Sequence, residues 1–397
     1  MNSSKPNYKR TMYSCFVAYI DQAIVASFAP LLFVMFHRSY GIPLSKITLL
    51  ITINFVVQIS VDLLCVKFVD KIGYRAAMIL AHLTSAAGFI GLAFLPDLFA
   101  DPFTGLLIAT MVYAIGGGLL EVVVSPIVES CPTDNKEMAM SMLHSFFCWG
   151  CLAVVLLTTA FFKIFGIENW KVVACLWAVL PLANMVSFFT CPIAPLLEEG
   201  EKGLSVRELL RNRNFWIIIV LMACAGASEL SVSQWASTFA ESTLGISKTL
   251  GDIMGPAFFA LLMGISRTVY GKFGDKIDLS KFMTGSAVLC IIAYIMISLV
   301  PVPAINLIGC GIAGFSVGIF WPGTFSRAAA TIRGGGTAMF AIMALFGDLG
   351  CSGGPTLVGE ISSLCGDNLS VGLAFGMIFP IVMIIGLIAL DRRAKKG

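Results

Sequence analysis

The sequence predicts an all-α integral membrane protein with twelve transmembrane helices, arranged as two six-helix repeats. Apolar residues make up 58% of the 397 residues and charged residues only 12%, whereas a soluble domain carries about a quarter charged residues. The apolar residues gather in stretches of about 20 or more, the length that crosses a bilayer as a helix. The phrase Phe-x-Asp-Lys-Ile occurs twice, at 68–72 and 273–277, which indicates an internal repeat.

Twelve apolar stretches are long enough to span the membrane. The first is too long for a cleaved signal peptide. The expected helices cover 11–36, 45–68, 73–96, 103–128, 138–165, 170–195, 214–240, 250–272, 280–300, 303–328, 335–362 and 369–390.

The basic residues predict the orientation. With the N-terminus inside, 21 of the 26 Lys and Arg residues fall in inside loops and tails and five fall outside. The positive-inside rule therefore places both termini in the cytoplasm, and a plasma or bacterial inner membrane is the expected location. The net charge of +3 is part of this inside excess, so no nucleic-acid partner is expected.

The only long polar stretch divides the chain into two. LLEEGEKGLSVRELLRNR at 196–213 follows the sixth helix and is expected to be a cytoplasmic linker between an N-terminal bundle, 1–195, and a C-terminal bundle, 214–397. The two copies of the repeated phrase follow helices two and eight, which are six helices apart. This spacing predicts parallel repeats, a plan found in transporters.

The loop VKFVDKIGYR at 66–75 resembles the signature Gly-x-x-x-Asp-Arg-x-Gly-Arg-Arg of the major facilitator superfamily. Asp70, Lys71, Gly73 and Arg75 match it, while Val66 replaces the first Gly. The second copy, GKFGDKID at 271–278, keeps its first Gly and Asp275-Lys276 but not the later Gly and Arg. An Asp here can bond helix N-termini and basic side chains, so these residues are expected to gate the cytoplasmic side.

Four helices are similar to the fucose permease-like sugar:proton symporters. The matching segments are GGGLLEVVVSP (116–126), LHSFFCWG (143–150), GASELSVSQW (226–235) and GIFWPGTFSRA (318–328). The resemblance implies that Glu121 carries the coupling proton and that the substrate is a sugar.

Six ionisable side chains lie well inside expected helices, each at a cost of roughly 2.5–3.5 kcal/mol at a helix centre. They are Asp21, Asp62, Glu121, His144, Glu229 and Asp348. A desolvated carboxylate favours its protonated form and can exchange a proton near neutral pH, so Glu121 is the first candidate for proton coupling. Gly117 and Gly118, one turn earlier, would admit a substrate or another helix. The alternative for Glu121 is a structural hydrogen bond.

Asp21 is the second candidate for proton coupling, with substrate binding or a structural role as alternatives. We expect Asp21 to face helix four, as the resemblance implies, and Gln22 to point elsewhere, about 100° around the helix. His144 could relay protons, bond a sugar hydroxyl or simply pack. Asp62 is assigned a gating or structural role because it lies two turns before Asp70.

Polar residues at helical spacing predict surfaces that line a cavity or face one another. One stripe in helix seven is Glu229, Ser233 and Ser237, with Gln234 beside it. Another stripe in helix eleven is Asp348, Ser352 and Thr356, and Gln58 with Asp62 forms a third in helix two.

Three tryptophans inside helices, Trp149, Trp235 and Trp321, are candidates for sugar stacking, since an indole face packs on a pyranose while its N–H bonds a hydroxyl. Pro322 is expected to break helix ten and free backbone carbonyls. No Lys or Arg is expected deep in a helix; Arg267 and Arg327 come closest. An anion carrier needs a buried cation, so a neutral solute is expected.

The first hypothesis is therefore a monomeric secondary transporter, not an enzyme, that moves a neutral monosaccharide or polyol with protons and needs no cofactor or metal. Cys148 and Cys151 form a CxxC motif, but without a second pair of ligands this motif does not predict a zinc site, which needs four. GCSGGPTLVG at 350–359 resembles the antiporter signature Gly-x-x-x-Gly-Pro-x-x-Gly-Gly, so a proton-coupled exporter of drugs or metabolites is the alternative. A third hypothesis is a membrane receptor that transports nothing, and an uptake assay would distinguish it from a transporter.

Overall fold

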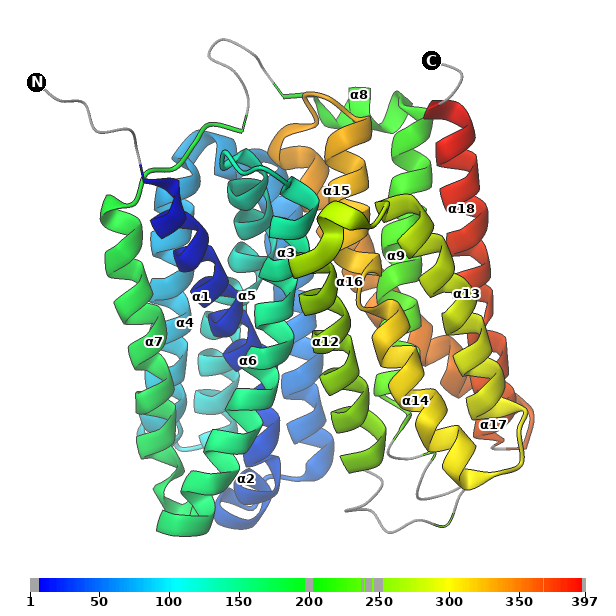
Figure 1. Ribbon diagram of the computed structural model, residues 1–397. Coiled ribbons are helices and arrows are strands. Elements are labelled where there is room, and N and C mark those ends of the chain that lie inside the picture. Colours follow the sequence, from blue (N-terminus) through cyan, green and yellow to red (C-terminus); the bar gives the residue numbers. More distant parts are fainter. Residues whose placement is uncertain are drawn as a thin grey trace, which may run out of the picture. The chain divides into compact units, whose positions relative to one another are not determined.

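The computed structural model describes residues 7–196, 203–236, 239, 245, 253–366 and 368–394. The regular elements of this described part are helices, and it contains no strand (Figure 1). Ser237 of the expected helix-seven stripe and residues 197–202 of the expected linker lie outside the described residues.

The first six expected helices are all present. The first is divided near Pro30, where an α-helix gives way to a 3₁₀ turn and a short second helix, because proline cannot donate a backbone hydrogen bond. The elements are α1 (Tyr8–Ser27), η1 (Ala29–Leu32), α2 (Phe33–Tyr40), α3 (Leu44–Ile72), α4 (Tyr74–Leu98), α5 (Pro102–Ser130), α6 (Lys136–Phe165), η2 (Ile167–Asn169) and α7 (Trp170–Thr190).

The second set of helices contains more interruptions. The expected eighth helix begins with a π-helical turn, and the tenth and twelfth are each divided in two. The elements are α8 (Val206–Arg211), α9 (Arg213–Ser233), η3 (Ile253–Ala257), α12 (Phe258–Phe273), η4 (Gly274–Lys276), α13 (Leu279–Ser298), α14 (Pro303–Val317), α15 (Phe320–Thr331), α16 (Gly336–Leu364), α17 (Leu369–Gly376) and α18 (Ile378–Ala394).

Eleven helical spans in the described residues are long and apolar enough to cross a membrane. The remaining expected span, 250–272, is represented by η3 and α12, whose described part is shorter. The prediction of an all-helical membrane-spanning protein is confirmed. The cytoplasmic orientation of the termini stays a prediction.

The chain divides into two compact units. Unit 1 contains residues 1–132, 149–203 and 336–341, and unit 2 contains 133–148, 204–335 and 342–397. In unit 1, α5 packs against α1, α3 and α4, and α4 also packs against α7. In unit 2, α9 packs against α14, α15 and α18, while α13 packs against α14 and α18. The expected boundary at 196–213 stays a prediction.

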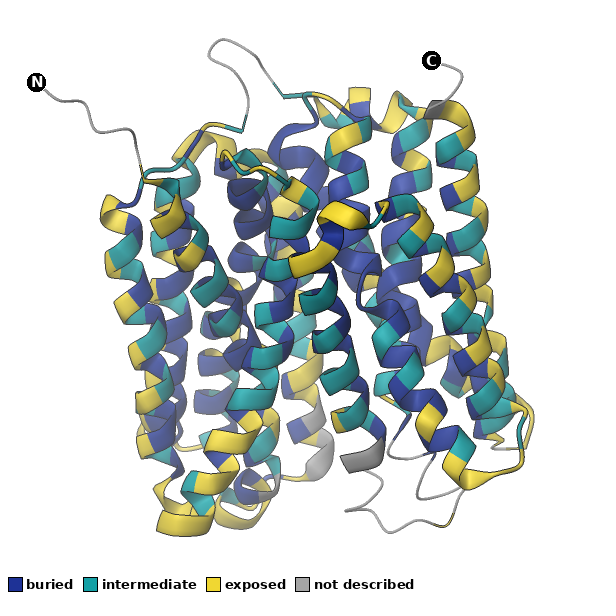
Figure 2. Cartoon of the chain, in the orientation of Figure 1, coloured by how far each residue is buried: buried dark blue, intermediate teal, exposed yellow. Residues whose placement is uncertain are grey.

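Helix α4 has one side that is buried and another that is exposed. On α4, Ala77, Ala81 and Phe89 are buried, whereas Leu83 and Phe94 are exposed. Figure 2 shows such buried and exposed stripes along many helices. Exposed large apolar side chains on a spanning helix are suited to lipid contact, since lipid tails are as apolar as the side chains.

The α3–α4 junction explains why the two copies of the repeated phrase differ. Gly73 has φ +80° and ψ 153°, a conformation that essentially only glycine adopts. The corresponding residue of the second copy, Asp278, has φ −65° and accepts a hydrogen bond from Lys281 N at 2.8 Å as the N-cap of α13. A side chain is thus tolerated, and useful, only in the second copy.

Candidate functional site

Unit 1 contains a polar cluster in which Glu121 of α5, itself half-buried, meets two buried glutamines. The Nε2 atom of Gln22 lies 3.4 Å from Glu121 Oε2 and 3.4 Å from Gln58 Oε1, at the long end of the hydrogen-bond range. A Cβ atom on Gly117 would lie 3.0 Å from Gln22 Oε1 and one on Gly118 3.2 Å from Gln58 Cα. The two glycines therefore admit helices α1 and α3 to α5, which is one of the two roles expected for them.

The expected direction of Gln22 on α1 is wrong. Gln22, expected to point elsewhere, reaches Glu121, while Asp21 is fully buried beside Ser85 of α4. The two residues lie about 100° apart around one helix, and the packing of α1 against α4 and α5, which the sequence does not encode locally, decides what each of them meets.

A second polar network in unit 1 was missed by the sequence analysis. His82 of α4 is fully buried; its Nδ1 lies 2.7 Å from Met78 O and its Nε2 2.9 Å from Asn184 Nδ2. The carbonyl can only accept, so Nδ1 donates and Nε2 accepts from the amide, which makes His82 neutral. Asn184 also donates to Ser14 O at 2.9 Å. This network joins α1, α4 and α7, and its position inside an expected helix was a signal available from sequence.

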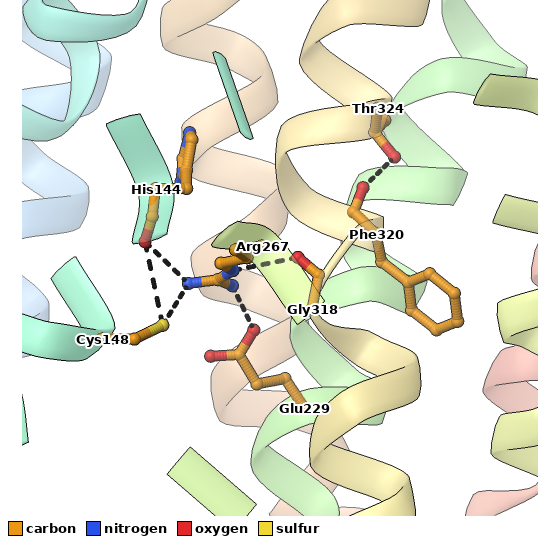
Figure 3. A network of polar contacts seen from close by, with 7 residues as sticks. All are labelled: His144, Cys148, Glu229, Arg267, Gly318, Phe320 and Thr324. Atoms are coloured by element: carbon orange, nitrogen blue, oxygen red, sulfur yellow. Dashed lines mark hydrogen bonds and ion pairs between the residues drawn. The ribbon is translucent and has the colours of Figure 1, made fainter. Parts of the chain in front are cut away.

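Unit 2 contains a buried arginine, which corrects the expectation that no basic residue lies deep in a helix. Arg267 of α12 has a side chain only 3% exposed, and its Nη2 lies 3.1 Å from Glu229 Oε2 of α9. The same guanidinium donates to Gly318 O at 2.9 Å, His144 O at 3.3 Å and Cys148 Sγ at 3.0 Å. Figure 3 shows these four partners around it. The long arginine side chain reaches inward because acceptors from three helices lie there.

Pro322 leaves one of these acceptors, the Gly318 carbonyl, without a helical partner. Helix ten is interrupted at residues 318–319, and Pro322 lies in the first turn of α15. Because proline has no N–H, the carbonyl four residues before it has no helical partner, and that carbonyl belongs to Gly318. Arg267 Nε donates a hydrogen bond to the Gly318 carbonyl. The backbone carbonyl that Pro322 was predicted to free is thus hydrogen-bonded to the buried cation.

The aromatic candidates are mostly engaged in packing. The indole N–H of Trp235 donates to Pro355 O at 2.9 Å. It was expected to bond a sugar hydroxyl, but in this structure it is already engaged. Trp321 is buried, and a Cβ atom on Gly347 would lie 2.3 Å from its ring. His144 stacks on Phe325 with ring centroids 5.9 Å apart.

The remaining candidates differ in burial. Asp62, Gln58 and Asp348 are buried, and Asp348 Oδ2 has no hydrogen-bond partner among the described residues. Trp149 and Ser233 are half-buried and Gln234 is exposed. In the helix-eleven stripe, Asp348 is buried while Ser352 and Thr356 are exposed. Their roles as substrate ligands stay predictions.

The first copy of the repeated loop makes contacts that the second copy does not show. Thr337, in the first turn of α16, donates to Asp70 Oδ1 at 2.6 Å, and Tyr74 OH lies 2.5 Å from the same Thr337 hydroxyl. Arg75 donates to Phe188 O and Cys191 O at the end of α7. Asp275 and Lys276 are exposed in η4, and Lys71 and Gly73 complete the first junction. The gating roles stay predictions.

Membrane helices that bury carboxylate, amide and guanidinium groups together are typical of solute carriers, where such groups mark transport pathways. The sequence pattern described as Major Facilitator Superfamily matches residues 11–355, and the chain belongs to that superfamily. It is therefore a transporter and not an enzyme.

Solved structures share this fold. FucP, a superfamily transporter in the outward conformation, aligns with TM-score 0.81 and 13% identity over 96% of this chain and 98% of that chain. The human organic anion transporter MFSD10 (TETRAN) aligns with TM-score 0.75 and 16% identity over 96% and 100%. The proton:xylose symporter XylE aligns with TM-score 0.76 and 12% identity over 97% and 94%. No curated protein sequence matches the chain.

Proposed function

We propose that this transporter moves a small hydroxylated solute, a monosaccharide or related polyol, together with protons by alternating access. The observation that carries the proposal is the cluster of half-buried Glu121 with buried Gln22 and Gln58. A carboxyl group among amides can take up and release a proton, and amides both donate to and accept from sugar hydroxyls. FucP from E. coli is a fucose:proton symporter and XylE a proton:xylose symporter, which supports the same chemistry here.

Arg267 bears on the charge of the solute. A neutral solute was expected because no buried cation was foreseen. The buried side chain of Arg267 means that this reason for expecting a neutral solute no longer holds. MFSD10, which has the same fold, is an organic anion transporter. The hydroxylated character of the solute rests on the Glu121 cluster and does not depend on its charge.

We assign the loop of the repeated phrase to gating. The Thr337–Asp70 hydrogen bond joins the end of α3 to the start of α16, and a carboxylate near a helix N-terminus is stabilised by the helix dipole. A monomer in a plasma or bacterial inner membrane, with both termini in the cytoplasm, completes the proposal.

The test uses purified protein in sealed vesicles that contain a trapped pH dye. Neutral sugars are added one at a time, and a sugar-evoked proton influx is the expected result. Glu121→Gln should abolish the influx while sugar-for-sugar exchange continues, because the amide binds like a protonated carboxyl but carries no proton. Glu360→Gln, which changes an exposed carboxylate of α16, is the matched control and should keep the influx.

Silence across sugars, polyols and sugar acids would overturn the proposal and favour the antiporter alternative. That alternative depended on the glycines of GCSGGPTLVG. In the structure, a Cβ atom on Gly350 would lie 2.0 Å from Ala223 O and one on Gly354 2.7 Å from Ala227 Cα of α9. The glycines therefore have a packing role that does not require antiport.

A further inference from the structure

Positive charge gathers on the surface of unit 2 where α8, the start of α9 and the end of α18 lie together. Helix α8 packs against α9, and α9 packs against α18 (Figure 1). Five exposed arginines lie on these three segments, and we call them the arginine patch: Arg207, Arg211, Arg213, Arg392 and Arg393. None of the five forms an ion pair with another described residue. The patch therefore presents its charge to the surroundings of the protein.

The acidic side chains on the same segments are bonded to other groups. Glu208 of α8 accepts hydrogen bonds from Ser205 N at 2.7 Å and from Ser205 Oγ at 2.6 Å. Asp391, beside Arg392 in α18, is paired with Arg327 of α15. The charge of Arg211 is felt by Glu208 and helps to lower the pKa of that carboxyl. One of the five positive charges is thus partly offset, and the patch as a whole stays strongly positive.

Hydrogen bonds hold the three segments of the patch together. The indole N–H of Trp216 on α9 donates to Leu210 O of α8 at 2.7 Å. Arg393 Nη1 lies 3.5 Å from Asn214 Oδ1, which connects the end of α18 to the start of α9. Arg207 and Arg211 are four residues apart on α8 and therefore share one side of it. The five arginines are thus anchored on a fixed backbone, although their side chains are exposed.

The spanning helices that carry the patch also expose apolar side chains. Trp216, in the first turn of α9, is exposed, and so is Val220 one turn further along. On α18, Ile381, Ile385 and Ile388 are exposed at helical spacing. Tryptophan at the start of a spanning helix is typical of the membrane–water interface. Cations at the interface followed by apolar helix faces match a molecule with an anionic head and apolar tails.

We propose that the arginine patch binds the headgroup of an anionic phospholipid, whose acyl chains lie along the exposed apolar faces of α9 and α18. A guanidinium group binds phosphate oxygens through two parallel hydrogen bonds. The patch lies at the end of unit 2 that is proposed to be cytoplasmic, and the cytoplasmic leaflet attracts basic segments through its anionic lipids. The lipid is a partner of the protein and not a solute, so this inference goes beyond the proposed function.

The test measures lipid binding to the purified full-length protein after lipids have been removed in a nonionic detergent. Dioleoylphosphatidylglycerol and dioleoylphosphatidylcholine, which differ in headgroup charge but not in acyl chains, are titrated in turn. Native mass spectrometry gives the apparent Kd of the first bound lipid. The anionic lipid should bind at least 10-fold more tightly than the zwitterionic one, and its affinity should fall as salt is added.

Variants separate this site from general attraction to a basic protein. Arg211→Gln with Arg393→Gln removes two charges of the patch and should weaken binding of the anionic lipid by about 10- to 30-fold. Lys9→Gln with Arg10→Gln removes two exposed charges of α1 in unit 1 and is the matched control, which should bind like wild type. Arg211→Lys with Arg393→Lys keeps both charges and should restore most of the affinity.

Three results would overturn the inference. Equal affinity for the two lipids would show that headgroup charge is not recognised. Equal losses in the patch variant and in the matched control would show general electrostatic attraction. Displacement of the lipid by an equal concentration of glycerol 3-phosphate would show that the acyl chains are not held. The experiment contains no solute, so each of these results leaves the proposed transport function standing.

Discussion

A pair of glycines in α16 allows a controlled test of how this helix packs. Gly350 and Gly353 lie in one turn of the same helix. A Cβ atom added at Gly350 would lie 2.0 Å from the backbone oxygen of Ala223 on α9, whereas one added at Gly353 would meet nothing within 4 Å. We therefore expect Gly350→Ala and Gly353→Ala to change stability in opposite directions.

The magnitude follows from two terms. Replacing a helical glycine by alanine favours the helix by about 0.5–1 kcal/mol, and both variants share this gain. Only Gly350→Ala must push a second backbone away. Overpacking of this kind costs about 1–3 kcal/mol, because a helix carbonyl cannot rotate aside as a flexible side chain can. The two variants should differ by about 1–3 kcal/mol, with Gly353→Ala the more stable.

The assay is thermal unfolding of both purified variants in one detergent, followed by the loss of the monodisperse peak in size-exclusion chromatography. One kcal/mol shifts Tm by roughly 2–4 °C in chains of 150–250 residues, so a separation of a few degrees is expected. A Gly350→Ala variant as stable as Gly353→Ala would refute the close approach of α9 and α16. It would also restore the antiporter interpretation of the glycine motif.

Four further predictions concern the loops and ends of the helices. Thr337→Val and Asp70→Asn should each lower the free energy of unfolding by about 1 kcal/mol or less, because Asp70 is exposed. The double variant should lose no more than either single variant, since both remove the same hydrogen bond, and a double-mutant cycle measured by thermal unfolding checks this. Gly73→Ala should cost about 1–3 kcal/mol because of its positive φ, measured by the same unfolding assay. Ser205 holds the pKa of Glu208 below its usual value, so the capping box that begins α8 is complete at neutral pH and is lost as the pH falls through the lowered pKa. The protection of amides 205–211 against exchange, relative to the intrinsic exchange rate at each pH, should fall there, and Ser205→Ala should remove this pH dependence. A fluorescent protein fused to the C-terminus should fluoresce in cells, and a dark but intact fusion would contradict the cytoplasmic orientation.

The helices could be predicted from sequence because a bilayer imposes a simple rule. Backbone groups in lipid must bond within their own segment, so apolar stretches of sufficient length are helices whatever surrounds them. The interruptions were harder to place. Pro322 was expected to break helix ten, but the sequence analysis gave no position for the break; the irregular residues lie at 318–319, where the carbonyl that proline leaves unpaired is located.

The directions of side chains could not be predicted, because they depend on groups far away in the chain. Arg267 lies six residues before the end of α12, a place from which arginine often extends outward to the membrane interface. It extends inward because its acceptors come from residues 38, 51 and 123 positions away. Asp21 and Gln22 show the same limit on a smaller scale, since the packing of α1 decides what each of them meets.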